Sequence, residues 1–123
     1  MIKKVALLLV LALMVFPLLI AVTLTCTDKN HVGNDWRTKI TYNGSSVYET
    51  FAVTASEGSS IVLTGQATEN DNIPDTGSGT LQLTLRNGAS ASTTFYVREN
   101  RGRYSGYQAT WVLKAHCEIS ERI

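Results

Sequence analysis

Residues 80–98 read TLQLTLRNGASASTTFYVR. The first half alternates leucine with threonine or glutamine, and the second half places Phe95 and Val97 two residues apart among polar neighbours. An apolar side chain at every second position is the pattern of a half-buried β-strand. Asn87 and Gly88 separate the halves, and both residue types tolerate the positive φ of a tight turn. The stretch therefore predicts two antiparallel strands joined as a hairpin.

The chain from Trp36 onward continues in the same style, because short β-branched and aromatic stretches alternate with turn residues and no helical period appears. The predicted strands are residues 36–42, 47–55, 60–68, 80–86, 92–98 and 104–117. The second and third of these are expected to pair as a hairpin, and residues 69–78 are expected to form a loop because they are rich in Asp, Asn, Pro and Gly. The predicted fold class is all-β: a small antiparallel meander, built as a curved sheet, a barrel or a sandwich.

The N-terminal segment has the layout of an export signal. Lys3 and Lys4 precede residues 5–25, which carry no charge and are mostly Leu, Val, Ala and Ile. Such a run predicts one N-terminal helix that places all that follows outside the cytoplasm. The run is close to the roughly 20 residues that span a bilayer, which favours a retained anchor over a cleaved signal or a lipoprotein signal. The predicted division is therefore an anchor or signal at 1–25 and an exported domain at 26–123.

The two cysteines lie at opposite ends of that exported domain. Cys26 follows the apolar run directly, and Cys117 precedes the C-terminus by a few residues. An even number of cysteines in an exported protein favours a disulfide. A Cys26–Cys117 bond would close nearly the whole domain into one loop and stabilise it by roughly 4 to 5 kcal/mol.

Charge and aromatic residues indicate a protein-binding surface rather than a nucleic-acid interface. The whole chain has a net charge of only +1, which implies no nucleic-acid partner. Arg98, Arg101 and Arg103 form its only basic cluster, and Tyr96 and Tyr104 lie beside them in the sequence. This set is either a solvated hairpin tip or a contact surface for an acidic partner or for lipid headgroups.

The sequence offers little that could carry catalysis or bind a metal. If the disulfide joined the two ends, His31, His116 and Asp28 could form a zinc site, although solvated histidines are the simpler interpretation. Asp71 and Asp75 could bind calcium with nearby asparagines, but their spacing matches no calcium loop. No nucleophile motif is present. We expect no catalytic residue, metal, cofactor or small-molecule substrate.

The layout is similar to that of a known family. A basic start, one apolar span, a cysteine next to it, a β-rich domain and a last cysteine resemble the FidL-like inner-membrane proteins of enteric bacteria. The resemblance extends to residues 51–65, FAVTASEGSSIVLTG, where that family tends to have a strand, a turn and a strand. It implies a ToxS-type accessory protein whose periplasmic domain acts on a membrane-bound transcription regulator.

These observations predict a non-enzymatic protein of the bacterial inner membrane whose β domain lies in the periplasm and binds another protein. The alternative is a periplasmic or secreted module released after signal cleavage, such as an enzyme inhibitor or a surface protein. A hydrolase or metal enzyme is a third, less favoured class.

Overall fold

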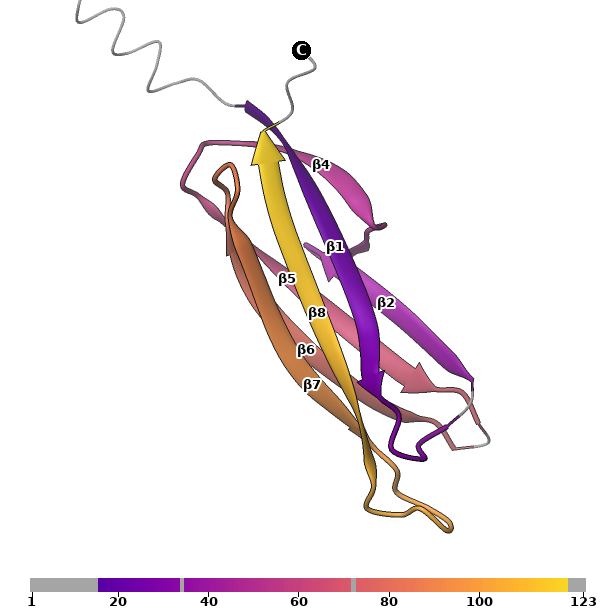
Figure 1. Ribbon diagram of the computed structural model, residues 1–123. Coiled ribbons are helices and arrows are strands. Elements are labelled where there is room, and N and C mark those ends of the chain that lie inside the picture. Colours follow the sequence, from indigo (N-terminus) through magenta and orange to yellow (C-terminus); the bar gives the residue numbers. More distant parts are fainter. Residues whose placement is uncertain (1–15, 34, 72, 120–123) are drawn as a thin grey trace, which may run out of the picture.

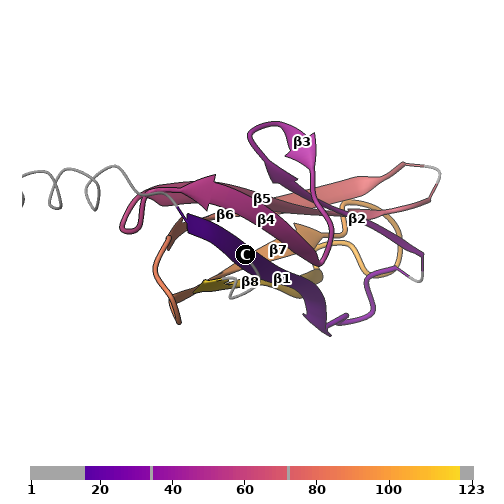
Figure 2. The same ribbon diagram turned by 90° about the horizontal axis from the view of Figure 1, so that it is seen from above.

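The protein is a sandwich of two antiparallel β-sheets, described by a computed structural model for residues 16–33, 35–71 and 73–119 (Figures 1 and 2). The all-β class is therefore confirmed. Within those residues the strands are β1 (Phe16–Asp28), β2 (Trp36–Tyr42), β3 (Ser45–Ser46), β4 (Thr50–Ala55), β5 (Ser60–Glu69), β6 (Asp75–Thr84), β7 (Ser90–Arg98) and β8 (Gln108–Ile119).

The strand order is not that of a meander. One sheet has the order β4-β1-β8-β7, and the other has the order β3-β2-β5-β6. Only the β2–β3, β5–β6 and β7–β8 connections join neighbouring strands of the same sheet, whereas the chain changes sheets after β1, β3, β4 and β6. The predicted meander is therefore wrong.

The predicted hairpin over residues 80–98 is also wrong, although both of its strands form. β6 pairs with β5 and β7 pairs with β8, so the turn at Asn87–Gly88 carries the chain from one sheet to the other. The Gly88 amide donates to the carbonyl of Cys117 at 2.8 Å, which ties this crossing to the end of β8. An alternating strand has one apolar face whether its sequence neighbour lies beside it or across the core, so alternation alone does not choose between these arrangements.

Two further expectations, one about strand pairing and one about a loop, are also wrong. Strand β4 pairs with β1 rather than with β5, so residues 47–55 and 60–68 form no hairpin. The expected loop at residues 69–78 is shorter, because the β5–β6 ladder runs to a last pair between Glu69 and Asp75. β6 is an edge strand of its sheet, a position where glycine and polar residues are tolerated.

The largest difference from the sequence-based prediction concerns the N-terminal segment. Residues 16–28 form β1, a strand held between β4 and β8. The predicted helix is therefore wrong for residues 16–25, and residues 1–15 lie outside the described part of the chain. Among the described residues, no helix has the length and apolar character needed to cross a membrane.

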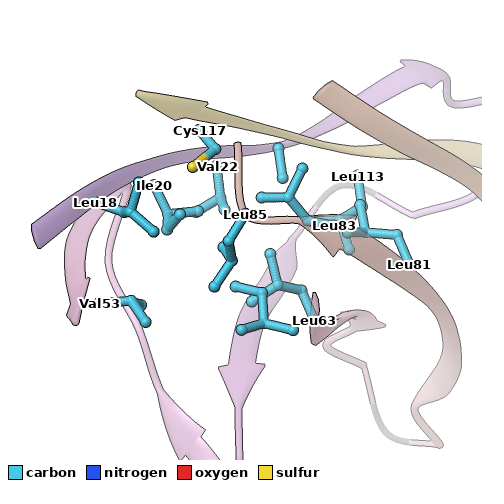
Figure 3. Close-up of a cluster of buried hydrophobic side chains, with 12 residues drawn as sticks. Leu18, Ile20, Val22, Val53, Leu63, Leu81, Leu83, Leu85, Leu113 and Cys117 are labelled. Carbon is cyan, nitrogen blue, oxygen red and sulfur yellow. The ribbon is translucent and has the colours of Figure 1, made fainter. Parts of the chain in front are cut away.

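Strand β1 is part of the hydrophobic core (Figure 3). Leu18, Ile20 and Val22 are at most 1% exposed, whereas Leu19, which points to the outer face, is 40% exposed. The inward side chains pack with leucines of β5, β6 and β8. The domain therefore includes residues 16–25, and a boundary at residue 26 would remove most of a central strand.

The two cysteines are free, and the fold keeps them apart. Cys26 pairs in register with Trp111 of β8, whereas Cys117 lies six residues further along the same strand, opposite Ile20. Six residues of strand span about 20 Å, but a disulfide needs Cα atoms within about 7 Å of each other. The predicted disulfide is therefore wrong, and the burial of Cys117 in the core contributes apolar packing instead.

Candidate functional site

Three loops meet at one end of the sandwich, opposite the end where β8 finishes (Figure 1). Their described residues are 29–33 and 35 after β1, 70, 71, 73 and 74 after β5, and 99–107 after β7, and we call this end the loop end. The Asn70 amide donates to the Asp35 carbonyl at 2.7 Å, which joins the first two loops. Loops held this way on a sandwich are a common place for binding residues.

An aromatic cluster occupies one side of the loop end. The His31 ring stacks on the Tyr104 ring with centroids 5.0 Å apart, and Tyr107 lies 5.8 Å from His31 and 5.7 Å from Tyr104. The Arg103 guanidinium lies 5.7 Å from the centre of the Tyr104 ring. Aromatic contacts between two loops restrict their motion and present rigid rings at the surface.

The structure divides the five predicted contact residues into two groups. Arg101, Arg103 and Tyr104 belong to the third loop of the loop end. Tyr96 and Arg98 point outward from β7, and Tyr96 is 52% exposed. His31 and Tyr107 are aromatic neighbours that the sequence analysis did not connect to this set. No local sequence signal connects His31 to Tyr104, because the two residues meet only through the pairing of β1 with β8, which are far apart in the sequence.

An acidic groove of about 760 Å³ lies beside the aromatic cluster. Glu69, Asp71 and Glu99 face one another there, with one carboxylate oxygen of each within 4.8 Å of those of the other two. Lys29, His31 and Tyr104 also line the groove. The acidic groove therefore combines side chains from all three loops.

Glu69 is the buried member of this acidic set. Its side chain is 5% exposed, and its Oε2 atom has no hydrogen-bond partner. Gly33 covers it so closely that a Cβ atom at that position would lie 2.5 Å from Glu69 Cγ. Glu69 also stands directly opposite Asp75, another buried acid, in the β5–β6 ladder. The fold thus buries a carboxylate where no basic side chain is paired with it in the described residues.

Burial, and then the neighbouring carboxyl groups of Asp71 and Glu99, raise the pKa of Glu69 from 4.5 to about 8. The folded state therefore holds a proton that the unfolded chain releases above about pH 4.5. Glu69 stabilises the fold fully below that pH, and the contribution is lost as the pH rises through about 8.

This shift predicts how stability changes with pH when metal ions are removed by a chelator. We expect the free energy of unfolding to fall by up to about 1.4 kcal/mol per pH unit between roughly pH 5 and 8 because of Glu69. Urea unfolding of the wild type and of Glu69→Gln tests this effect, because only the wild type carries a titrating carboxyl group at position 69. A difference between the two proteins that stays constant over this pH range would contradict the prediction.

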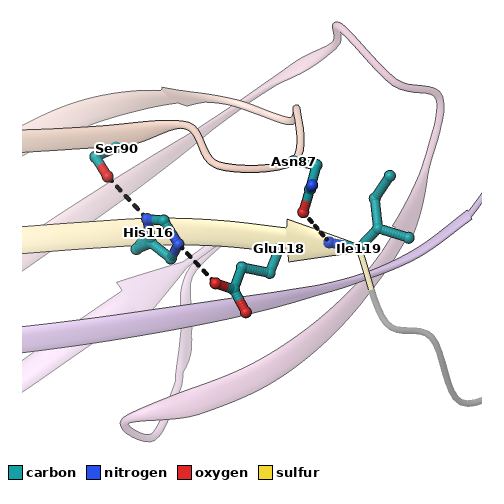
Figure 4. A network of polar contacts seen from close by, with 5 residues as sticks. All are labelled: Asn87, Ser90, His116, Glu118 and Ile119. Carbon is teal, nitrogen blue, oxygen red and sulfur yellow. Dashed lines mark hydrogen bonds and ion pairs between the residues drawn. The ribbon is translucent and has the colours of Figure 1, made fainter.

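A second polar network lies on the outer face of the β1–β8–β7 region (Figure 4). Ser90 Oγ is 2.8 Å from His116 Nδ1, and His116 Nε2 is 3.1 Å from Glu118 Oε1. This order resembles a hydrolase triad, but acyl transfer also needs N–H donors aimed at the substrate oxygen. Strand backbone N–H groups point along the sheet and not out of its face. The network as it stands is an exposed contact between β7 and β8 that orients the histidine ring.

The metal sites considered from the sequence are not formed as expected. Asp28, which precedes His31 by three residues, pairs with Thr110 of β8. His116 lies six residues further along β8, so Asp28, His31 and His116 do not come together as a zinc site. Asp71 and Asp75 also have different partners. Asp75 accepts a hydrogen bond from Asn100 at 2.8 Å, whereas Asp71 joins Glu69 and Glu99.

The sequence analysis missed Glu69 as a buried acid, although one signal was available. The inward residues of β5 occur at every second position from Ile61, and Glu69 continues that series. Its grouping with Glu99 has no local signal, because thirty residues of chain separate the two. Comparison with protein-family models, with curated proteins and with solved structures gave no match.

Proposed function

We propose that this chain is an exported, non-enzymatic binding module whose loop end contacts another protein. The observation that carries the proposal is the convergence of His31, Arg103, Tyr104 and Tyr107 on neighbouring loops. Tyrosine and arginine are the residues that most often dominate the energy of protein interfaces. Tyrosine buries a large area at a small cost in side-chain entropy, and here stacking already restricts the rings.

The charge of this surface indicates the chemistry of the partner. Arg98, Arg101 and Arg103 are exposed along β7 and the third loop, and no acidic side chain is paired with them in the described residues. A protein surface that carries carboxylates beside an apolar patch would complement them. The resemblance to FidL-like proteins narrows the proposal to a membrane-bound transcription regulator, whereas an enzyme as partner would make the module an inhibitor.

Export is supported by Lys3, Lys4 and the apolar residues that follow them. Since residues 16–25 belong to β1, only residues 5–15 of the apolar run remain available for a signal or an anchor. Its length lies within the 7 to 15 residues or so of a signal-peptide core and is short of the roughly 20 that span a bilayer. This favours the released module over the retained anchor.

A photo-reactive amino acid at position 104 tests the proposal in cells. In this variant the photo-reactive amino acid replaces Tyr104. We expect ultraviolet light to cross-link the variant to one defined partner, because position 104 would lie in the interface. The matched control places the same amino acid at Tyr48, which is 86% exposed and lies between β3 and β4, away from the loop end. The intact mass of the cross-linked protein in each cell fraction also reports whether its N-terminal segment was removed.

A defined adduct from position 104 that is absent from position 48 supports the proposal. The proposal fails if both positions give the same adducts, or if position 104 gives none while the protein is folded and exported. Arg103→Ala should weaken formation of the adduct by at least about tenfold, since an interface arginine of this kind contributes about 1 to 2 kcal/mol or more.

A further inference from the structure

We infer that the loop end contains a calcium-binding site formed by Glu69, Asp71 and Glu99. The inference concerns the folded domain alone and does not depend on the proposed protein partner. Glu69 ends β5, Asp71 follows it in the second loop, and Glu99 begins the third loop. A bound cation would therefore join two loops that the backbone brings together only at this end of the sandwich.

The spacing of the three carboxylates fits one cation. An oxygen of each lies within 4.8 Å of an oxygen of the other two. Two oxygens bound to the same Ca²⁺ at about 2.3 to 2.6 Å can be at most about 5 Å apart. All three carboxylates can therefore reach one ion with only small side-chain movements.

The buried oxygen of Glu69 is the independent observation that indicates a ligand. The side chain is about 95% buried because it is 5% exposed, it faces the acidic groove, and its Oε2 atom has no hydrogen-bond partner. An unpaired buried polar atom costs about 1 to 3 kcal/mol. Gly33 leaves room for this carboxylate by lacking a side chain, so the position of Glu69 is built into the fold.

Basic side chains do not neutralise the cluster. Lys29 lines the acidic groove, yet among the described residues the only ion pair within 4.0 Å joins His116 to Glu118, on the outer face of the other sheet. Asp75 adds another buried acid opposite Glu69. A divalent cation at this point would bind the unpaired Oε2 atom and supply the positive charge that no basic side chain of the described residues provides there.

Calcium suits this ligand set better than other common cations. The ligands are all carboxylate oxygens, which favours hard cations over zinc, and His31 does not belong to the cluster. Mg²⁺ demands octahedral geometry at about 2.0 to 2.1 Å, whereas Ca²⁺ accepts irregular arrangements and completes its shell with water and backbone carbonyls. Asp71 and the half-buried Glu99 leave one side of the cluster open to such ligands.

Calorimetric titration of the folded protein with CaCl₂, after treatment with a chelator, tests the inference. We expect one ion to bind with a dissociation constant of about 10⁻⁴ to 10⁻³ M, the range of sites in extracellular modules. A free calcium concentration ten times the dissociation constant should then raise the melting temperature of the protein, because the ion binds only the folded state. MgCl₂ should bind at least about tenfold more weakly.

Three variants separate this site from general screening of negative charge. Asp71 is exposed, so the Asp71→Asn protein should fold normally. It should bind calcium at least about tenfold more weakly than the wild type, because one charged ligand is lost. Glu69→Gln should abolish binding. Glu57→Gln removes one negative charge from the exposed turn between β4 and β5, at the other end of the sandwich, and should bind like the wild type.

Selective loss of binding in Asp71→Asn and Glu69→Gln supports the site. The inference is overturned if the wild type does not bind calcium in this range, if all three variants respond equally, or if Mg²⁺ binds as tightly as Ca²⁺. Trp36 stands opposite Glu69 in the β2–β5 register, so its fluorescence gives a second local readout.

Discussion

Replacing Ile20 by aspartate is expected to leave the domain unfolded in water. Ile20 is fully buried in β1, between Phe51 of β4 and Cys117 of β8. Truncation of such a side chain to alanine costs about 2 to 5 kcal/mol, and a buried unpaired charge costs more. Since a small domain has only about 5 to 15 kcal/mol of stability in total, Ile20→Asp should remove most or all of it.

Leu19→Asp provides the control, because Leu19 is the adjacent residue and points to the outer face with 40% of its surface exposed. Its cost should be about 1 kcal/mol or less, mainly from the lower strand propensity of aspartate. Circular dichroism and urea unfolding of Ile20→Ala, Ile20→Asp and Leu19→Asp give the measurement. If residues 16–25 were a membrane helix, adjacent positions would respond alike, and a chain starting at Cys26 would fold. Either outcome would refute the assignment of β1 to the core.

Adding a single methyl group at Gly77 is expected to have the second large effect. Gly77 lies in β6, at the edge where that strand passes close to β7 of the other sheet. A Cβ atom at Gly77 would overlap the backbone carbonyl oxygen of Tyr96 and lie 3.0 Å from Val97 Cγ2. A backbone carbonyl in a strand cannot move away without shifting the strand, so Gly77→Ala should cost about 1 to 3 kcal/mol or more.

Whether Gly77→Ala lowers or raises the free energy of unfolding shows whether β6 and β7 lie in close contact at this point. In a strand without a close neighbour, replacing glycine by alanine usually stabilises by about 0.4 to 1 kcal/mol, because the unfolded chain loses freedom. Gly79→Ala should cost less, because its nearest neighbour is the Phe95 ring at 2.8 Å, a side chain that can adjust. The exposed Ser78→Ala is the neutral control. Denaturant unfolding of the three variants measures these effects, and a Gly77→Ala protein as stable as the wild type would rule out the close β6–β7 contact.

From Trp36 onward, the sequence by itself determined where most of the strands lie and, where apolar and polar residues alternate, which side of a strand faces the core. The predicted strands from Trp36 onward overlap β2 and β4 to β8, and the turn at Asn43–Gly44 has the positive φ angles that its residues tolerate. These features depend on neighbours within a few residues. The backbone places side chains on opposite faces at every second position, so the alternation can be read without knowing the partner strand.

Strand β1 shows no alternation that could be read from the sequence. Its outward residues Leu19 and Ala21 are as apolar as its inward residues Leu18 and Ile20. A continuous apolar run is compatible with a membrane helix and with a central strand alike, and its length favoured the helix. Burial between β4 and β8 decides for the strand, and this depends on residues far away in the sequence.

Only the tertiary structure decided which strands pair, how far apart the cysteines lie and which side chains share the loop end. Pairing adds the same ladder hydrogen bonds whichever strand supplies them, so the choice depends on how both sheets together bury their apolar faces. The acidic groove shows the consequence. Glu69 and Glu99 come from different sheets and meet only because β5 and β7 end on the same side of the sandwich, where packing of Gly33 buries the Glu69 carboxylate.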